Sequence, residues 1–157
     1  MLAGMHTVLL WLLVINLGIA FGAGLYEHRV VAPQWLATSP DSSRHWHPDV
    51  ARRDDTGRKF WAFVTTLPLT LLTLASLGAA WHAHGSVRGW WLAAGLLALA
   101  DRALTFVYFI PTMVGLMQAA DSPAAVAAAT RWWRLNYLRH ALVLAAWLAS
   151  LNALQRV

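Results

Sequence analysis

An aspartate and an arginine stand next to each other in the middle of a long apolar stretch. Asp101 and Arg102 interrupt the run from Gly89 to Met117. One helical face of this run carries Asp101, Thr105, Tyr108 and Thr112, at spacings of i, i+4, i+7 and i+11. A charged side chain at the centre of a bilayer costs about 2.5–3.5 kcal/mol, so it usually serves a purpose. We expect Asp101 to face the interior of a helix bundle, as part of a site or in an Asp–Arg contact that joins helices.

A second group of polar residues ends the first apolar run. Tyr26, Glu27 and His28 follow the small residues Gly22 to Gly24, which allow a neighbouring helix to approach closely. One helical face of this run carries Asn16, Ala20, Ala23 and Glu27. The pattern predicts a groove of small residues that leads to the carboxylate of Glu27. A solvated helix end is the alternative.

The last apolar run opens with a third polar group. Trp132, Asn136 and Arg139 share one helical face, and His140 lies one turn from Asn136. Asparagine inside an apolar helix usually bonds to another helix, and arginine near a helix end can extend to the headgroups, so both have structural alternatives. Because antiparallel neighbours bring these three groups to one end of a bundle, we expect Glu27, Arg102, Tyr108, Asn136, Arg139 and His140 to meet in one cavity.

Composition indicates which elements must position these residues. The 157-residue chain is 59% hydrophobic and only 12% charged, whereas soluble domains carry roughly 25% charged residues. A helix needs about 20 apolar residues to span a bilayer. We predict one domain over residues 1–157, an all-α integral membrane bundle of four helices in up-down-up-down order. The expected spans cover residues 6–28, 60–81, 89–117 and 134–154.

One long polar connection separates the first two spans. It covers residues 29–59 and contains Pro33, Pro40 and Pro48, so it cannot form a single helix. The other connections are short, which favours antiparallel neighbours. A short additional helix is expected over Ala124–Thr130, after a start signal at Asp121, Ser122 and Pro123.

Positive charge predicts the orientation of the bundle. Eight basic residues fall on the side of the long connection, and only Arg88 and Arg156 fall on the opposite side. The long connection should therefore face the cytoplasm, with both termini outside, as in a bacterial inner membrane. The net charge of +5 then reflects loops beside an anionic lipid leaflet, and we expect no nucleic-acid partner.

Cysteine and histidine usage limits the cofactors. The chain has no cysteine, which excludes disulfides, thiolate catalysis and iron–sulfur clusters. The pairs His45–His47 and His82–His84 are expected in solvated loops. A metal or haem site that uses His28, His45, His47 and His140 stays open as an alternative.

Three short motifs are similar to a known family. They are Gly-x-Gly-Leu-Tyr at Gly22–Tyr26 followed by Pro33, Tyr-Phe-Ile-Pro at Tyr108–Pro111, and Arg-Trp-x-x-Leu-Asn-x-x-Arg at Arg131–Arg139. With these motifs the chain resembles a family of small four-helix membrane proteins that includes the anthrone oxygenases of polyketide pathways. The resemblance covers nearly the whole chain.

The resemblance implies oxidation of a lipophilic phenolic anthrone to a quinone by O₂, with no cofactor expected. His140 or Glu27 would be the base that removes a proton from carbon, and Arg102 and Arg139 would stabilise the resulting oxyanion. The residues expected to contact the substrate are Tyr26, Asp101, Tyr108, Asn136 and Trp132. A non-catalytic protein that binds a lipophilic ligand or assists transport is the alternative, and either protein could form a homo-oligomer.

Overall fold

The computed structural model describes residues 2–39 and 43–157 of the chain. Most of them are helical, and η denotes π-helical turns below. In chain order the elements are α1 (Leu2–Tyr26), η1 (Glu27–Val31), α2 (Ala32–Trp35), β1 (Leu36–Thr38), β2 (Arg44–Trp46), α3 (Pro48–Asp54), η2 (Gly57–Thr66), α4 (Leu67–His82), α5 (Ser86–Leu104), η3 (Thr105–Phe109), α6 (Ile110–Gln118) and α7 (Pro123–Leu154).

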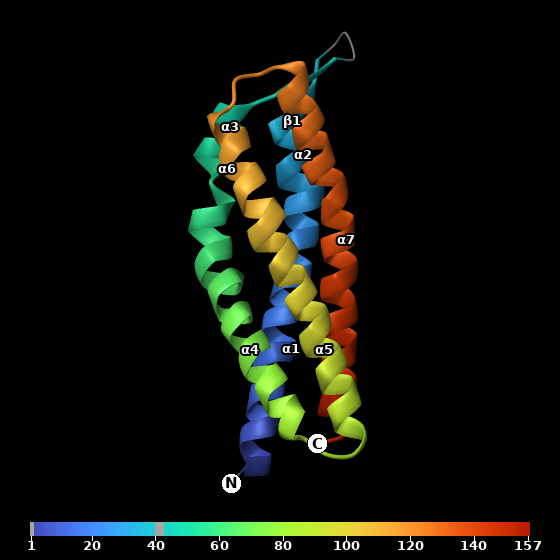
Figure 1. The fold of residues 1–157 in the computed structure, drawn as a ribbon. Helices are drawn as coiled ribbons and strands as arrows, with labels where there is room; N and C mark the ends of the chain where they lie inside the picture. Colours follow the sequence, from blue (N-terminus) through green and yellow to red (C-terminus); the bar gives the residue numbers. More distant parts are fainter. Residues whose placement is uncertain (1, 40–42) are drawn as a thin grey trace.

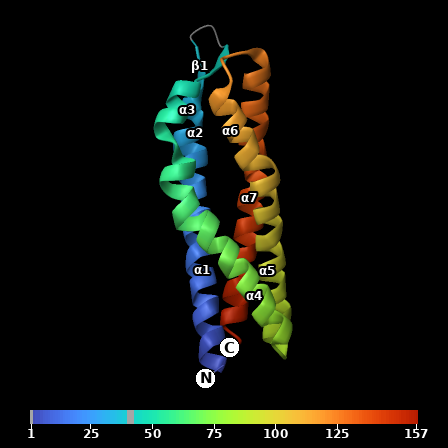
Figure 2. The same cartoon turned by 60° about the vertical axis from the view of Figure 1, so that its left-hand side comes forward.

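The described residues form an elongated helical bundle. Figures 1 and 2 place both termini at one end of the bundle and β1, α3 and the start of α7 at the other end. Within the described part of the chain, four helical stretches are long and apolar enough to cross a membrane. They are Gly4–Trp35, Gly57–His82, Ser86–Gln118 and Pro123–Leu154. The prediction of a helical bundle with four long apolar helices is confirmed.

Small residues set how closely these helices pack. Leu13, Leu17 and Leu69 are fully buried against alanines such as Ala98 and Ala146 on α5 and α7. A Cβ atom added to Gly95 would lie only 2.6 Å from a methyl group of Leu77, so a larger residue at this crossing of α4 and α5 would displace the Leu77 side chain. Burial of these leucines stabilises the bundle by roughly 1.5–3 kcal/mol per side chain relative to an aqueous environment.

The expected 29–59 connection is more ordered than predicted. The first helix continues through η1 and α2 as far as Trp35, beyond the predicted end at residue 28. Leu36–Thr38 and Arg44–Trp46 then pair as a two-stranded antiparallel sheet, with Leu36 opposite Trp46. The short helix expected at 124–130 is instead the first part of α7, which runs unbroken from Pro123 to Leu154. The start signal is confirmed, since the Ser122 hydroxyl accepts a hydrogen bond from the Ala125 amide.

His45 and His47 were expected in a solvated loop, but they lie in the ordered region formed by β1, β2 and α3, which is called the cap below. The His45 Nδ1 atom lies 2.7 Å from an Asp121 carboxylate oxygen, and the Trp46 amide donates to the other oxygen at 2.9 Å. The hydrogen bond from His45, together with that from Trp46, holds the pKa of Asp121 below its ordinary value. The contact therefore supports the cap above the ordinary pKa of an aspartate and is lost as the pH falls through the lowered pKa. His47 precedes α3, and its amide donates to Trp35.

Each of three helices contains a π turn immediately before a proline. The amides of Ala32, Leu67 and Ile110 bond to carbonyls five residues back, and each of these residues precedes a proline. Within an α-helix, proline lacks the amide hydrogen and its ring collides with the carbonyl four residues back. The wider π turn moves that carbonyl aside, so each helix continues through its proline.

At Pro68, another helix supplies the missing hydrogen-bond donor. In an α-helix the Val64 carbonyl would accept from residue 68, which is a proline. The side-chain amide of Asn16 on α1 donates to this carbonyl instead, at 2.9 Å. Asn16 is 9% exposed, so the bond is shielded from water. The sequence pattern that placed Asn16 on an inward face is thereby explained by a backbone group on η2.

Asn16→Ala should lower the free energy of unfolding of the detergent-solubilised protein by about 1 kcal/mol, because a hydrogen bond between apolar helices contributes about that much. Asn152→Ala is the matched control, since the Asn152 amide donates to Leu148 on its own helix. The cost of Asn16→Ala should shrink in a Pro68→Ala background, where residue 68 regains an amide hydrogen for Val64. Equal costs in both backgrounds, measured by thermal unfolding, would contradict the assignment.

Candidate functional site

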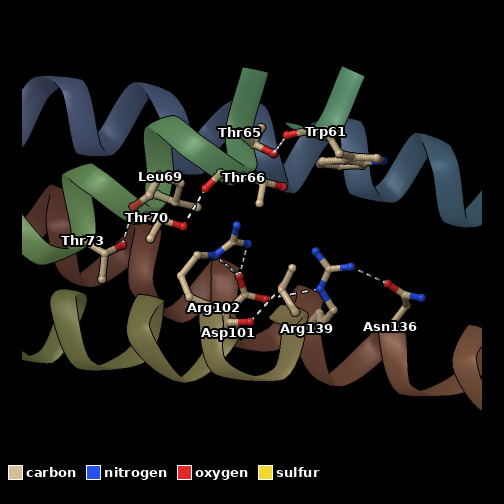
Figure 3. A network of polar contacts seen from close by, with 11 residues as sticks. Trp61, Thr65, Thr66, Leu69, Thr70, Thr73, Asp101, Arg102, Asn136 and Arg139 are labelled. Atoms are coloured by element: carbon tan, nitrogen blue, oxygen red, sulfur yellow. Dashed lines mark hydrogen bonds and ion pairs between the residues drawn. The ribbon is translucent and has the colours of Figure 1, made fainter. Parts of the chain in front are cut away.

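A buried carboxylate joins two arginines at the interface of α5 and α7. Asp101 is fully buried, and its Oδ2 atom accepts hydrogen bonds from Arg102, including one from Nε at 3.1 Å. Its Oδ1 atom accepts from the Nε of Arg139 on α7 at 3.4 Å. Arg139 also donates to the side-chain oxygen of Asn136 at 3.2 Å. Figure 3 shows these four side chains as one polar cluster between the helices.

Local contacts hold the members of this cluster in place. The Asn136 amide donates to the Trp132 carbonyl one turn earlier, which orients its oxygen toward Arg139. The Arg139 guanidinium lies 4.7 Å from the centroid of the Phe109 ring, a cation–π contact. The Thr70 and Thr73 hydroxyls of α4 donate to carbonyls of their own helix, as Figure 3 shows. Arg102 has a buried Nη1 atom without a hydrogen-bond partner in the described structure.

Asp101 thus satisfies both interpretations of the sequence. Its carboxylate faces the interior, as expected, and it also connects α5 to α7 through Arg139. Two guanidiniums share one carboxylate, so the cluster carries a formal charge of +1 (two positive groups minus one negative). The carboxylate of Glu27 supplies further attraction for Arg139.

Glu27 is fixed by two residues of the second long helix. Its Oε1 atom accepts a hydrogen bond from the Thr56 hydroxyl at 2.5 Å and one from the Trp61 indole at 2.8 Å. Both donors lie at or just before η2, so the first and second long helices meet around this carboxylate. Glu27 is therefore held by hydrogen bonds within the bundle and is not part of a solvated helix end.

Glu27 and Arg139 both line a cavity of about 600 Å³. The cavity lies between η2 on one side and η3 with α6 on the other, and Arg52 of α3 lines its outer end. Its walls are mainly aromatic and aliphatic. The lining residues are Glu27, Trp35, Arg52, Asp55, Thr56, Gly57, Arg58, Trp61, Ala62, Thr66, Thr105, Phe109, Ile110, Met113, Val114, Met117, Gln118, Trp132 and Arg139.

The cavity has charged groups at both ends. Arg139 and Glu27 lie at the inner end, beside the buried cluster. Arg52 and Arg58 lie at the outer end, paired with Asp49 and Asp55 at 2.5 Å. The Arg52 guanidinium also donates to the Met117 carbonyl, which ties α3 to α6.

The expected meeting of six polar residues in one cavity is only partly right. Glu27 and Arg139 line the cavity, as does Trp132, whose indole donates to the Phe109 carbonyl at 3.1 Å. Asn136 contacts Arg139 directly and Arg102 is connected to it through Asp101, and neither Asn136 nor Arg102 lines the cavity.

Tyr108 and His140 are not among the residues that line the cavity, so the expected meeting is wrong for these two. Tyr26, which was expected to contact a substrate, does not line the cavity either. The π turn of η3 adds a residue to the helical repeat, so Phe109 takes the inward position expected for Tyr108. Tyr26 is 62% exposed on the outer surface. His140 follows Arg139 and is turned about 100° away around α7, against Gly24 and His28.

The sequence interpretation missed the second long helix as a contributor. Trp61 donates to Glu27 and lines the cavity, although a tryptophan near the end of an apolar helix is equally typical of a membrane interface. No role was predicted for Thr56, and Phe109 was noted only within the Tyr108–Pro111 motif. A buried carboxylate requires donors, so Glu27 itself was the signal that a nearby helix had to supply them.

The histidines named as alternative metal ligands do not form one group. His45 contacts Asp121 in the cap, whereas His28 and His140 lie against each other between α1 and α7. In the described ranges 2–39 and 43–157, no group of three or more His, Cys, Asp or Glu side chains could hold a metal ion.

Comparison with known proteins gives no family assignment. No protein-family model matches the chain, and no curated protein and no solved structure matches it either. The similarity to the anthrone oxygenases thus rests on the three sequence motifs alone.

Asp101→Asn should destabilise the folded protein by about 3 kcal/mol or more, because it leaves two buried guanidiniums without their shared negative charge. Asp49→Asn is the control, since the Asp49–Arg52 pair is largely exposed and contributes at most about 1 kcal/mol. Adding Arg102→Met to Asp101→Asn should restore part of the lost stability by removing one unpaired charge. Equal melting temperatures for the Asp101 and Asp49 variants would show that the cluster is not electrostatically coupled.

Proposed function

We propose that the chain is a multi-pass integral membrane protein with its four long helices in up-down-up-down order. The support is the length and apolar character of these helices, together with large apolar side chains on the outside of the bundle. Phe63 is 72% exposed and Leu71 is 69% exposed, and burial of both in acyl chains would remove the cost of their contact with water.

Arginines are more numerous at the end of the bundle that carries β1 and β2 than at the end that carries the termini (Figure 1). This excess supports an orientation with the β1–β2 end in the cytoplasm and both termini outside. A reporter that is active only in the cytoplasm, fused after Val157, should therefore be inactive. The same reporter inserted at the β1–β2 turn should be active. The reverse pattern would overturn this orientation without affecting the bundle.

We propose that the cavity binds a lipophilic aromatic molecule that carries a weakly acidic group. The observation that carries this proposal is that a carboxylate and a guanidinium, Glu27 and Arg139, share one mainly apolar cavity. Aromatic walls such as Trp61 and Phe109 suit flat rings. Arg139 would pair with an oxyanion, and Glu27 would accept a proton.

Oxidation of an anthrone-like substrate by O₂ is the reaction that this arrangement supports best. Glu27 removes a proton from the acidic methylene carbon, and Arg139 holds the oxygen of the resulting enolate. The electron-rich enolate then reduces O₂. Overall, the carbon loses two hydrogen atoms and gains one oxygen atom as a carbonyl, and the second oxygen atom leaves as water.

The other polar residues take supporting roles in this proposal. Asp101 and Arg102 position Arg139 rather than touch the substrate, which replaces the earlier assignment of Arg102 to the oxyanion. Thr56 and Trp61 orient Glu27, and both can release it when a substrate competes for the carboxylate. His140 is given no role in this proposal, because it is not among the residues that line the cavity.

Glu27→Gln should lower the rate of anthrone oxidation by about 10²-fold or more, because the amide cannot accept the proton. Substrate binding, followed by quenching of tryptophan fluorescence in proteoliposomes, should change little. Arg139→Met should weaken both binding and rate. Tyr26→Phe is the control, since this exposed side chain lies outside the cavity, and it should leave oxygen consumption unchanged.

A non-catalytic ligand-binding protein is the second candidate, favoured by the bonds that already hold the Glu27 Oε1 atom. Wild-type protein that binds an anthrone but consumes no oxygen would support this candidate and remove the oxygenase proposal. Absence of binding as well would remove both.

A further inference from the structure

The rings of two histidines contact each other outside the cavity, and neither histidine is among the residues that line it. His28 lies in η1 and His140 in α7, one residue beyond Glu27 and Arg139 respectively. Their ring centroids are 5.3 Å apart and their planes are nearly perpendicular, at 86°. His28 is only 7% exposed. Neither ring takes part in the proposed reaction.

Three nitrogen atoms of this pair have nothing to bond within the described structure. Both ring nitrogens of His28 and the Nε2 atom of His140 are buried without a hydrogen-bond partner. A neutral imidazole has one N–H donor and one lone pair, and burying either without a partner costs about 1–3 kcal/mol. Most buried polar groups in folded proteins are satisfied, so three such atoms on two adjoining rings mark a candidate ligand site.

The surrounding residues fix both rings. The indole of Trp133 stacks on His28, with centroids 4.8 Å apart and planes 4° from parallel. The same indole donates to the His28 carbonyl at 3.2 Å. His140 packs against Gly24, where an added Cβ atom would lie 2.8 Å from the ring Cε1 atom. Glycine at position 24 is therefore required for the present place of the His140 ring.

We propose that His28 and His140 bind a single Cu(I) ion. Imidazole nitrogen is a ligand suited to copper, and Cu(I) can be held by two such nitrogens, whereas Zn²⁺ in structural sites almost always takes four ligands. Arg29 and Arg139 are near this pair, and Asp101 offsets part of their charge; the remaining positive charge disfavours a divalent ion more than a monovalent one. We do not count Glu27 as a further metal ligand, because its Oε1 atom already accepts hydrogen bonds from Thr56 and Trp61.

The test is the copper content of the whole protein, measured without any activity assay. Protein in detergent is loaded with copper and ascorbate under anaerobic conditions, passed through a desalting column and analysed for metal. The wild type should retain about one copper ion per chain, and X-ray absorption should show two-coordinate Cu(I) with nitrogen ligands. His28→Ala and His140→Ala should lose it. His45→Ala should retain it, because His45 lies in the cap with Asp121.

Gly24→Ala tests the geometry with both histidines in place. The new methyl group would displace the His140 ring, so the affinity for Cu(I), measured by competition with a chromophoric chelator, should fall about tenfold or more. Gly22→Ala is the matched control, because nothing lies within 4 Å of a Cβ atom at that position. This pair of variants keeps the test decisive if a histidine variant fails to fold.

Two results would overturn the proposal. The first is wild-type protein that retains no copper, which would leave a bridging water between the two rings as the explanation. The second is equal copper retention in the wild type and both histidine variants, which would place the metal elsewhere. Neither result bears on the reaction proposed at Glu27 and Arg139, which is measured separately by oxygen consumption.

Discussion

The arrangement of the bundle depends on one buried carboxylate that neutralises two guanidiniums. Asp101 pairs with Arg102 on its own helix and with Arg139 on α7. Removal of charges from water costs several kcal/mol per ion, so each member requires the others to remain in place. This mutual requirement fixes α5 against α7 at the depth of the cavity. It also holds Arg139 at the cavity wall, where a ligand can reach it.

The π turns before Pro33, Pro68 and Pro111 complement this electrostatic constraint. Each of them borders the cavity or contributes residues to it, because η1 supplies Glu27, η2 supplies Trp61 and η3 supplies Phe109. The wider turns allow long apolar helices to continue through proline while they change the face that they present. The cavity therefore lies where three of the four long helices depart from regular α-helical geometry.

The sequence predicts the four apolar helices, the inward face of Asp101 and the start of α7, because these follow from hydropathy, helical periodicity and capping. It does not predict the cavity wall. The contact from Trp61 to Glu27 spans 34 positions, and a tryptophan near a helix end has no signal that separates this role from an interfacial one. Tyr108 was misplaced because a periodicity argument assumes a constant α-helical repeat, which η3 interrupts.

The interruption at η3 has an evolutionary consequence, since a π turn is equivalent to one residue inserted into an α-helix. Deletion of one residue from Thr105–Phe109 would let this turn close as a regular α-helical turn, and α6 would keep the faces that it now presents. Met113 and Met117 would then still line the cavity. A deletion in a regular part of the helix would instead rotate everything beyond it by about 100°, so η3 is the position at which this helix can lose a codon without exchanging the lining of the cavity.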